Sequence, residues 1–490
     1  MRKRIKALIC ALVLGLASSC LSTPNPATGG QDFTPFMSPA KEAQIGADEH
    51  PKILARFGGV YQDPAIGGYV AEVGGRVMAH AGAQQQSFRF TVLNSPQVNA
   101  FALPGGYVYV TRGLLALANS EAQLAGVLAH EVGHVVARHT AQRYNRAIFT
   151  SLGAAVLGAV AGNQLVDQLV QIGGELYLKG FSRDQEFEAD TLGVRYMAGA
   201  GYDPHAQARF LAAMGSHSAL ESKIAGAQGR DPIADFFATH PRSEERVQRA
   251  IAAAQVTGGA QNAPRRRQRY LDTIQGLVYG DDPSQGLVRG RVFSHPKLGF
   301  SFTVPPGYRL INTDQAVFAK GPNGAAIKFD GAKKQDAGRD VLNYLSRVWA
   351  ARLSLVDVER LTINGMPAAT GHTIVNAKSG GKADLRLVAI RFSRDRIVRF
   401  MMLTPVNQLG RLRQELQRTT FSFRRLGQAE RSWLKPFRVR LLTFGRGDSI
   451  DGLAARLPIE GYKVARFRTL NGLGPNDRPP PGVQLKTIAE

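Results

Sequence analysis

The chain has almost no cysteine: its 490 residues include only Cys10 and Cys20. Cys10 lies in an apolar stretch, 7–17, that follows the basic start 1–6, and the two together predict an export signal that is later removed. The exported chain would keep one cysteine and could form no internal disulfide bond. Its stability must therefore come from packing, for which a length of roughly three domains is sufficient.

Long apolar runs are also missing. The stretches 7–17 and 147–162 are both shorter than the roughly 20 residues that a helix needs to cross a bilayer. The second stretch is uncharged and rich in Ala and Gly, which favours a buried helix or a membrane-facing hairpin. A true spanning helix is the less favoured alternative.

The apolar start ends in Ala17-Ser18-Ser19-Cys20, which resembles a bacterial lipoprotein processing site, although Ala17 stands where that pattern prefers Leu. We therefore expect residues 1–19 to be a signal peptide and Cys20 to carry a lipid. Residues 20–39, rich in Thr, Pro and Gly, are expected to be a tether. Ordinary cleavage after a small residue, or an uncleaved N-terminal anchor, are the alternatives.

Acidic residues are scarce, with 38 Asp and Glu against 61 Lys and Arg, for a formal net charge of +23. Loss of the four basic residues in 1–6 with the signal would leave +19. Such a charge favours anionic surroundings, either membrane headgroups or acidic cell-envelope polymers, unless it only reflects the composition of the organism. No nucleic acid is expected as a partner, because export argues against it and 386–425 has no aromatic-platform motif.

What the chain does contain is the run His130-Glu131-Val132-Gly133-His134. Residues four apart lie on one face of a helix, so the imidazoles of His130 and His134 can bind one metal ion. Glu131 beside them can reach a water on that ion. Zinc is the metal that this geometry suits best.

The motif is predicted to lie on a helix. Ser120 followed by Gln123 forms a predicted capping box, and apolar residues then recur at helical spacing. Gly133 is costly inside a helix, which indicates that another segment packs closely over it. His139 falls about half a turn from the face of the motif, so it is interpreted as a surface or packing histidine.

The third metal ligand has to come from elsewhere, and the acidic run 181–190 is the best candidate. Glu186 and Asp190 lie one helical turn apart, so one can bind the metal while the other accepts the N–H of a ligating imidazole. Glu188 points away from both. Without the zinc motif, this run would be typical of a solvated helix face.

Three segments together resemble the family-forty-eight zinc metallopeptidases, which include the CAAX prenyl proteases and the HtpX-like and BepA-like proteases. They are 130–134, 182–190, and Thr239-His240-Pro241 with Arg246. The likeness covers about residues 40–275. It implies one Zn²⁺ per chain and the following roles: zinc ligands His130, His134 and Glu186, general base Glu131, and Asp190 as the support of a ligating histidine.

His240 and Arg246 match a pair that lies near the reacting carbonyl in some members of this family. His240 could stabilise the developing oxyanion, or it could take the open position of zinc as a latch that keeps the enzyme silent. Arg246 could add positive charge at the same oxyanion or brace Asp190. Both choices stay open at the level of sequence.

The segment before the motif predicts helices over 40–55 and 64–81, then a strand at 88–93 and a strand pair around Pro104-Gly105-Gly106. In zinc peptidases, the substrate commonly pairs with such a strand as an added strand. Asn99, Ala100 and Phe101 would be its nearest contacts, and the family resemblance supports this. A purely structural hairpin is the alternative.

Beyond the peptidase-like region, 276–289 is expected to be a linker. Residues 290–428 alternate like strands with two helical stretches, which predicts an α+β domain of unknown role without a catalytic cluster. Residues 434–490 resemble a LysM module, the β-α-α-β unit that binds the glycan of peptidoglycan.

The predicted fold class is α+β: a mainly helical zincin-type metalloprotease domain over 40–275 with a small edge-strand sheet, an α+β domain, and a small β-α-α-β module. The predicted function is a zinc-dependent endopeptidase of the bacterial cell envelope, on the periplasmic side. Its substrates would be misfolded or stalled envelope proteins. The alternative is a non-hydrolytic zinc-containing scaffold or chaperone.

Overall fold

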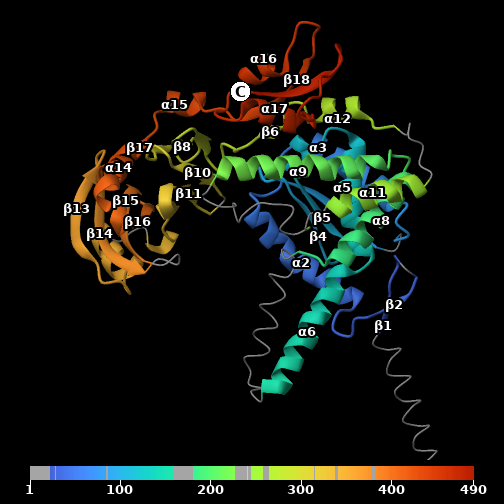
Figure 1. Ribbon diagram of the computed structural model, residues 1–490. Coiled ribbons are helices and arrows are strands. Elements are labelled where there is room, and N and C mark those ends of the chain that lie inside the picture. Colours follow the sequence, from blue (N-terminus) through green and yellow to red (C-terminus); the bar gives the residue numbers. More distant parts are fainter. Residues whose placement is uncertain are drawn as a thin grey trace, which may run out of the picture.

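The structure is a computed structural model that describes residues 22–490 except 28, 84–85, 159–179, 227–239, 241–243, 258–263, 314, 337–339 and 377–380. For residues 22–24 and 149–158 the backbone alone is described. Figure 1 shows a helix-rich body from the N-terminal half, a large sheet to one side of it, and a small C-terminal unit against the body. The chain is of the mixed α+β class, as predicted.

The helix-rich body surrounds a three-stranded sheet of order β3-β5-β4, in which β3 is parallel and β4 antiparallel to β5. The strands are β3 (Arg89–Leu93), β4 (Ala100–Leu103) and β5 (Tyr107–Thr111). The helices are α2 (Pro39–Arg56), α3 (Pro64–Met78), α4 (Arg112–Leu117), α5 (Glu121–Val136), α6 (His139–Gly158), α8 (Arg183–Gly199), α9 (His205–Ala225), α11 (Glu244–Val256) and α12 (Arg267–Ile274).

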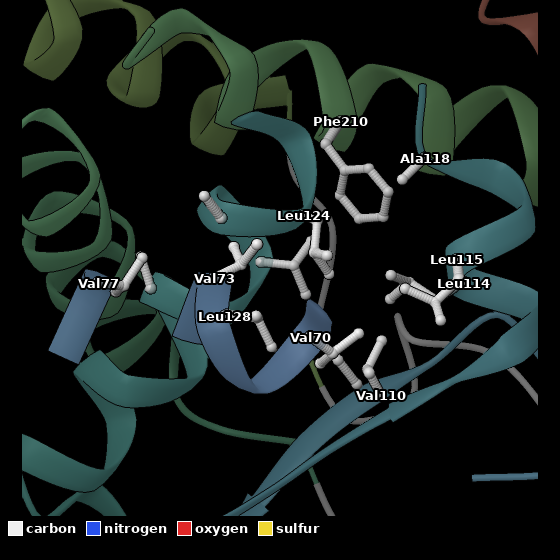
Figure 2. Close-up of a cluster of buried hydrophobic side chains, with 14 of the residues drawn as sticks. Val70, Val73, Val77, Val110, Leu114, Leu115, Ala118, Leu124, Leu128 and Phe210 are labelled. Carbon is white, nitrogen blue, oxygen red and sulfur yellow. The ribbon is translucent and has the colours of Figure 1, made fainter. Parts of the chain in front are cut away.

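Helix α5 is the central element of this body, and every one of its residues except Val135 is buried. Figure 2 shows Leu124 and Leu128 of α5 among valines of α3, leucines of α4 and Phe210 of α9. Burying one such leucine stabilises the fold by about 2 kcal/mol. The helix that carries the metal motif is therefore held from several sides by apolar packing.

The start of α5 follows the predicted cap in part. Ser120 Oγ accepts a hydrogen bond from the N–H of Gln123 at 3.2 Å. The Gln123 side chain, however, accepts from the N–H of Asn119 at 2.6 Å, so the reciprocal half of a capping box is replaced by a bond one residue earlier. The main-chain N–H groups of Asn119 and Gln123 at the start of the helix therefore both have acceptors.

Gly133 has the role that a mid-helix glycine predicts. A Cβ at this position would lie 3.2 Å from the main-chain oxygen of Ala189 in α8, closer than ordinary contact. The backbone of α8 therefore packs directly on α5. This close approach brings the acidic run beside the histidine motif.

Helix α5 ends at Val136, and α6 begins after a turn at Arg138, which has a left-handed backbone with φ 55°. The buried guanidinium of Arg138 donates to the carboxylate of Glu42, to Thr34 Oγ1 and to the main-chain oxygen of Met37. These bonds stabilise a backbone conformation that is costly for an arginine. The chain consequently changes direction just after the metal motif.

The prediction of a free tether over 20–39 is wrong for its described part. β1 (Ser22–Pro24) and β2 (Gln31–Phe33) form an antiparallel hairpin. The main-chain N–H of Phe36 donates to Asn145 Oδ1 at 2.9 Å, and Arg138 donates to Thr34 and Met37 on either side of it. Buried polar groups need such partners, so the segment is fixed to the α5–α6 junction. The signal peptide and Cys20 lie outside the described residues and stay predictions.

The apolar stretch 147–162 continues α6 up to Gly158, and its remainder lies outside the described residues. Across the part of the chain that the structure describes, no helix combines the length and apolar character that crossing a membrane requires.

Residues 276–289, expected to be a linker, contain two short strands, β6 (Val278–Tyr279) and β7 (Leu287–Arg289). Two sheets follow, of order β17-β9-β8-β7 and β10-β11-β12-β16-β15-β14-β13. Their remaining strands are β8 (Val292–His295), β9 (Phe300–Thr303), β10 (Arg309–Asn312), β11 (Val317–Lys320), β12 (Ala326–Gly331), β13 (Val356–Ile363), β14 (Met366–Asn376), β15 (Lys382–Ser393), β16 (Arg396–Pro405) and β17 (Arg424–Arg425).

The helical segments of this region are α13 (Val341–Asn343) with a π-helical continuation over Tyr344–Trp349, α14 (Leu409–Ser422), α15 (Gln428–Trp433), and 3₁₀ turns at Pro322–Gly324, Lys334–Asp336 and Val406–Gln408. α14 packs on β9 and β16. The core between them is aromatic and includes Phe302, Phe329, Phe400 and Phe423.

The C-terminal unit consists of β18 (Phe437–Thr443), α16 (Ile450–Ala455), α17 (Lys463–Asn471) and β19 (Gln484–Ala489), and β6 completes its sheet in the order β19-β18-β6. Lys486 of β19 is fully buried, and its Nζ donates to the main-chain oxygens of Ala116, Leu117 and Ala118 at 2.6, 3.1 and 2.7 Å. These carbonyls lie at the C-terminal end of α4. The last carbonyls of a helix have no hydrogen-bond donor within the helix, and the helix dipole favours a cation beside them. The ammonium thus attaches the C-terminal unit to the peptidase-like body.

The first prediction concerns this lysine. Lys486→Met keeps the aliphatic stem but removes the shared donor of three buried carbonyls, of which Leu117 O keeps a second donor in Asn119 Nδ2. We therefore expect the free energy of unfolding to fall by about 2–3 kcal/mol. Guanidinium denaturation followed by circular dichroism measures it. Lys435→Met, at an exposed position, is the control and should change stability by less than about 0.5 kcal/mol. Equal effects of both variants would contradict the role assigned to Lys486.

Candidate metal centre

Four buried side chains from separate parts of the helix-rich body converge on one point. His130 and His134 come from α5, Glu186 from the first turn of α8, and His240 from just before α11. One donor atom from each lies within 4.8 Å of all the others. The structure thus brings the three predicted ligands His130, His134 and Glu186 together, and it adds His240 as a fourth possible donor.

The distances between donor atoms fit a tetrahedral metal. His130 Nε2 lies 3.0 Å from His134 Nε2 and 3.2 Å from His240 Nδ1. Glu186 Oε1 lies 3.0 Å from His240 Nδ1 and 3.5 Å from His134 Nε2. Four ligands about 2.05 Å from a zinc ion would be about 3.3 Å apart. Nitrogen and carboxylate donors at these separations are what zinc requires.

Glu131 lies beside this set and is completely buried. Its Oε1 is 3.4 Å from His240 Nε2, yet neither carboxylate oxygen forms a hydrogen bond within the described part of the chain. Burial raises the pKa of Glu131, against the opposing effect of the nearby histidines. An unsatisfied buried carboxylate with a raised pKa is suited to exchange a proton with a water or substrate.

The ligand Glu186 is held in its charged form. Burial works against ionisation, but His240, His134 and Arg246 keep the pKa of Glu186 well below its usual value. Arg246 NH1 lies 2.6 Å from Glu186 Oε2. A carboxylate that stays ionised can bind a cation without first losing a proton.

His130 is oriented by a second carboxylate, as predicted for Asp190. His130 Nδ1 lies 2.9 Å from Asp190 Oδ1, which leaves Nε2 directed at the donor cluster. Arg246 donates to both oxygens of Asp190, at 2.7 and 2.8 Å. Burial raises the pKa of Asp190, but Arg246 and His130 bring it below its usual value. Arg246 was considered either as a charge near the oxyanion or as a brace for Asp190. In the structure its guanidinium binds Asp190.

His139 is a packing histidine, one of the two kinds expected, and not a surface histidine. It is fully buried, and its Nδ1 lies 2.8 Å from His134 Nδ1. Its Nε2 lies 3.2 Å from Glu188 Oε2, so Glu188 also reaches this network. The half-turn estimate assumed one continuous helix, whereas the turn at Arg138 brings His139 back toward the motif.

Phe181 is a further contact that sequence reasoning missed. Its ring stacks on His134 with centroids 3.9 Å apart, and the guanidinium of Arg143 lies over the same ring. Its position beside the capping serine of α8 was visible in the sequence, but nothing there indicated which face it would cover.

The predicted substrate-binding residues lie at the free edge of the small sheet. β4 pairs only with β5 in this sheet. Ala100 and Phe101 are buried, and the Phe101 ring packs between Phe57 and Tyr109. The main-chain oxygen of Asn99 accepts from the N–H of Thr111, so the main-chain groups of Ala100 and Ala102 point to the free edge in the alternating antiparallel pattern. Only the backbone of this strand is therefore placed to pair with a peptide.

These observations define the class of the helix-rich body. A helix with two histidines one turn apart, an unpaired glutamate between them and a third ligand from a second helix form a metallopeptidase centre of the His-Glu-x-x-His type. Residues 64–254 match peptidase family M48. This segment of the chain is therefore similar to the metallopeptidases of that family.

Named relatives share this segment. The mitochondrial metalloendopeptidase OMA1 of Arabidopsis thaliana is 35% identical over 39% of this chain and 36% of its own length. OMA1 of Schizosaccharomyces pombe is 32% identical over 42% of this chain and 59% of its own length. The beta-barrel assembly-enhancing protease of Escherichia coli K12 is 29% identical over 50% of each chain. The chain thus matches about a third to three fifths of the length of these relatives.

Solved structures are less similar. The solution structure of cyanobacterial PsbP from Synechocystis sp. PCC 6803 aligns with 30% of this chain and 98% of that protein, at a TM-score of 0.23 and 14% identity. This likeness is too weak to define a fold.

The second prediction tests the support behind the ligands. Arg246→Met would leave Asp190 and Glu186 buried without their cation, so we expect the free energy of unfolding of the metal-free protein to fall by about 3–5 kcal/mol. Chemical denaturation measures it. Arg249→Met on the same helix removes an exposed pair with Glu245 and a contact with the Phe187 ring, and it should cost less than about 1 kcal/mol. A small effect of the first change would contradict the ion-pair network.

Proposed function

We propose that this chain is a zinc-dependent endopeptidase of the bacterial cell envelope. One observation carries the proposal: Glu131, a buried carboxylate that forms no hydrogen bond within the described residues, lies beside the donor set of His130, His134, Glu186 and His240. A purely structural metal site has no use for such a group, because leaving it buried and unpaired is costly. The family match supports peptide hydrolysis as the reaction.

When bound by these donors, zinc would supply Lewis-acid polarisation of the scissile carbonyl and lower the pKa of a water at its open position. The remaining steps belong to side chains. Glu131 accepts the proton of the attacking water at a carboxylate oxygen and returns it to the leaving nitrogen. Asp190 keeps His130 in the tautomer that presents Nε2 to the metal.

The substrate is proposed to bind as an added strand on β4. An extended peptide there would exchange main-chain hydrogen bonds with Ala100 and Ala102. Asn99 and Phe101, the neighbouring residues of the same strand, would also lie beside the peptide. Main-chain hydrogen bonds of this kind depend little on the side chains of the substrate. They suit substrates whose chain is extended, such as misfolded or stalled envelope proteins.

For His240 we propose the latch. Its Nδ1 takes the fourth corner of the donor set, 3.2 Å from His130 Nε2 and 3.0 Å from Glu186 Oε1. A water can occupy that corner only when His240 moves away. His240 Nε2 also faces Glu131, so the same side chain blocks the base.

The four-donor arrangement also favours a second candidate, a non-hydrolytic zinc-containing scaffold or chaperone, because structural zinc sites are closed by four protein ligands. The two candidates differ in one measurable property. If His240 is a latch, its side chain moves away from the metal position and the enzyme can turn over substrate. If His240 is a permanent ligand, it stays in place and no turnover occurs.

Location and partners follow from the remaining segments. Processing at Cys20 would attach the chain to a membrane by a lipid, and residues 434–490, with the order β18-α16-α17-β19, would bind peptidoglycan as a LysM-like module. A relative named for beta-barrel assembly supports the envelope as the place of action.

The third prediction concerns the base. Glu131→Gln keeps the size of the side chain and the metal ligands, so one zinc per chain should remain bound while casein cleavage falls by about 10²–10⁴-fold. Metal analysis and a fluorescent casein assay measure the two quantities. Asp184→Asn, an exposed acid on α8, is the matched control and should leave both unchanged. Cleavage at the parent rate by Glu131→Gln would refute the assignment.

The fourth prediction separates the roles of His240. If the side chain is a latch, His240→Ala should raise casein cleavage several-fold with zinc still bound by the other three residues. A fall in the rate would indicate an oxyanion stabiliser instead, and removal of zinc by a chelator should abolish the activity in either case. No cleavage by the parent or by this variant, with zinc bound in both, would favour the scaffold.

A further inference from the structure

His134, the second histidine of the motif, is supported by a network of its own. His139 is fully buried between His134 and Glu188, with its Nδ1 2.8 Å from His134 Nδ1 and its Nε2 3.2 Å from Glu188 Oε2. The Nδ1 of His130 reaches a carboxylate directly, whereas the Nδ1 of His134 reaches one through a second imidazole. The two ligands are therefore held by different groups, from different sides of the cluster.

The hydrogen positions in this network follow from metal binding. If His134 binds through Nε2, its Nδ1 must carry the proton. That proton can be donated only to an acceptor, so His139 must present an unprotonated Nδ1 and carry its own proton on Nε2. The Nε2–H then donates to Glu188, whose carboxylate completes the chain.

We propose that His139 and Glu188 are positioning residues that fix the tautomer and ring orientation of His134 for metal binding. The inference rests on the proposed metal centre and goes beyond it, because it assigns a function to two side chains outside the donor set. Partners of this kind typically change metal affinity by 10–100-fold. Neither residue is expected to touch the substrate.

The surrounding fold is built to keep His139 in place. The left-handed turn at Arg138, bonded to Glu42 and Thr34, returns the chain so that α6 starts beside the motif. Phe181 stacks on the face of the His134 ring and so hinders its rotation. Glu188 lies at the surface end of the network, with 38% of its side chain exposed, so it can be changed without opening the core.

The test measures zinc binding rather than hydrolysis. Purified full-length Glu188→Ala, His139→Ala and His139→Gln variants are compared with the parent by chelator competition at one fixed pH, by the visible spectrum of the cobalt-substituted protein, and by denaturation of the metal-free protein. Asp184→Ala is the matched control, because it removes an exposed acid one turn earlier on the same helix. Casein cleavage by the parent is recorded in parallel.

We expect Glu188→Ala to weaken zinc binding by about 10-fold and to alter the cobalt spectrum without moving the metal-free denaturation midpoint. His139→Ala should weaken binding more, by up to about 100-fold, and His139→Gln should restore part of it, because an amide can accept from His134 and donate to Glu188. Asp184→Ala should match the parent in every readout.

Parental zinc affinity in both Glu188→Ala and His139→Ala, with a change in the denaturation midpoint alone, would show that the pair only fills space and would overturn the inference. A parent that binds zinc but cleaves no casein would count against the endopeptidase and leave the positioning result intact. A parent that binds no zinc would overturn both.

Discussion

The close packing of α5 against α8 at Gly133 and Ala189 is the contact on which the rest of the structure depends. A side chain at position 133 would lie 3.2 Å from the main-chain oxygen of Ala189, so the two helix backbones would have to separate by a few tenths of an ångström. The glycine lets α8 lie close to α5 and bring Glu186 to the two imidazoles.

Bringing these helices together buries several charges, and the structure compensates them selectively. Asp190 and Glu186 share Arg246, so two carboxylates are stabilised as anions by one cation. Glu131 forms no hydrogen bond within the described residues and lies 3.4 Å from His240 Nε2. Burial raises the pKa of Glu131, whereas the pKa of each of the two carboxylates beside Arg246 is lowered, so Glu131 is the carboxylate suited to proton transfer.

Both ends of the described chain attach to the same helical body. The N-terminal hairpin is fixed through Arg138 at the turn that follows the metal motif. The C-terminal unit is fixed through Lys486 at the end of α4. Segments that read as a tether and a separate module are therefore parts of one assembly around the metal centre, and buried polar contacts fix both of them to it.

The sequence by itself determined the local features: the helix with His130 and His134 on one face, the general position of the acidic helix, the strand pair before the motif, and the mixed fold class. These follow from periodicity and spacing within short stretches, which local physics controls. Tertiary structure alone decided the position of His240 in the donor set, the return of His139 to His134 and the pairing of Lys486 with carbonyls more than 360 residues away. A left-handed turn or a buried long-range hydrogen bond leaves no period in the sequence, because its stability comes from partners that only the folded chain brings together.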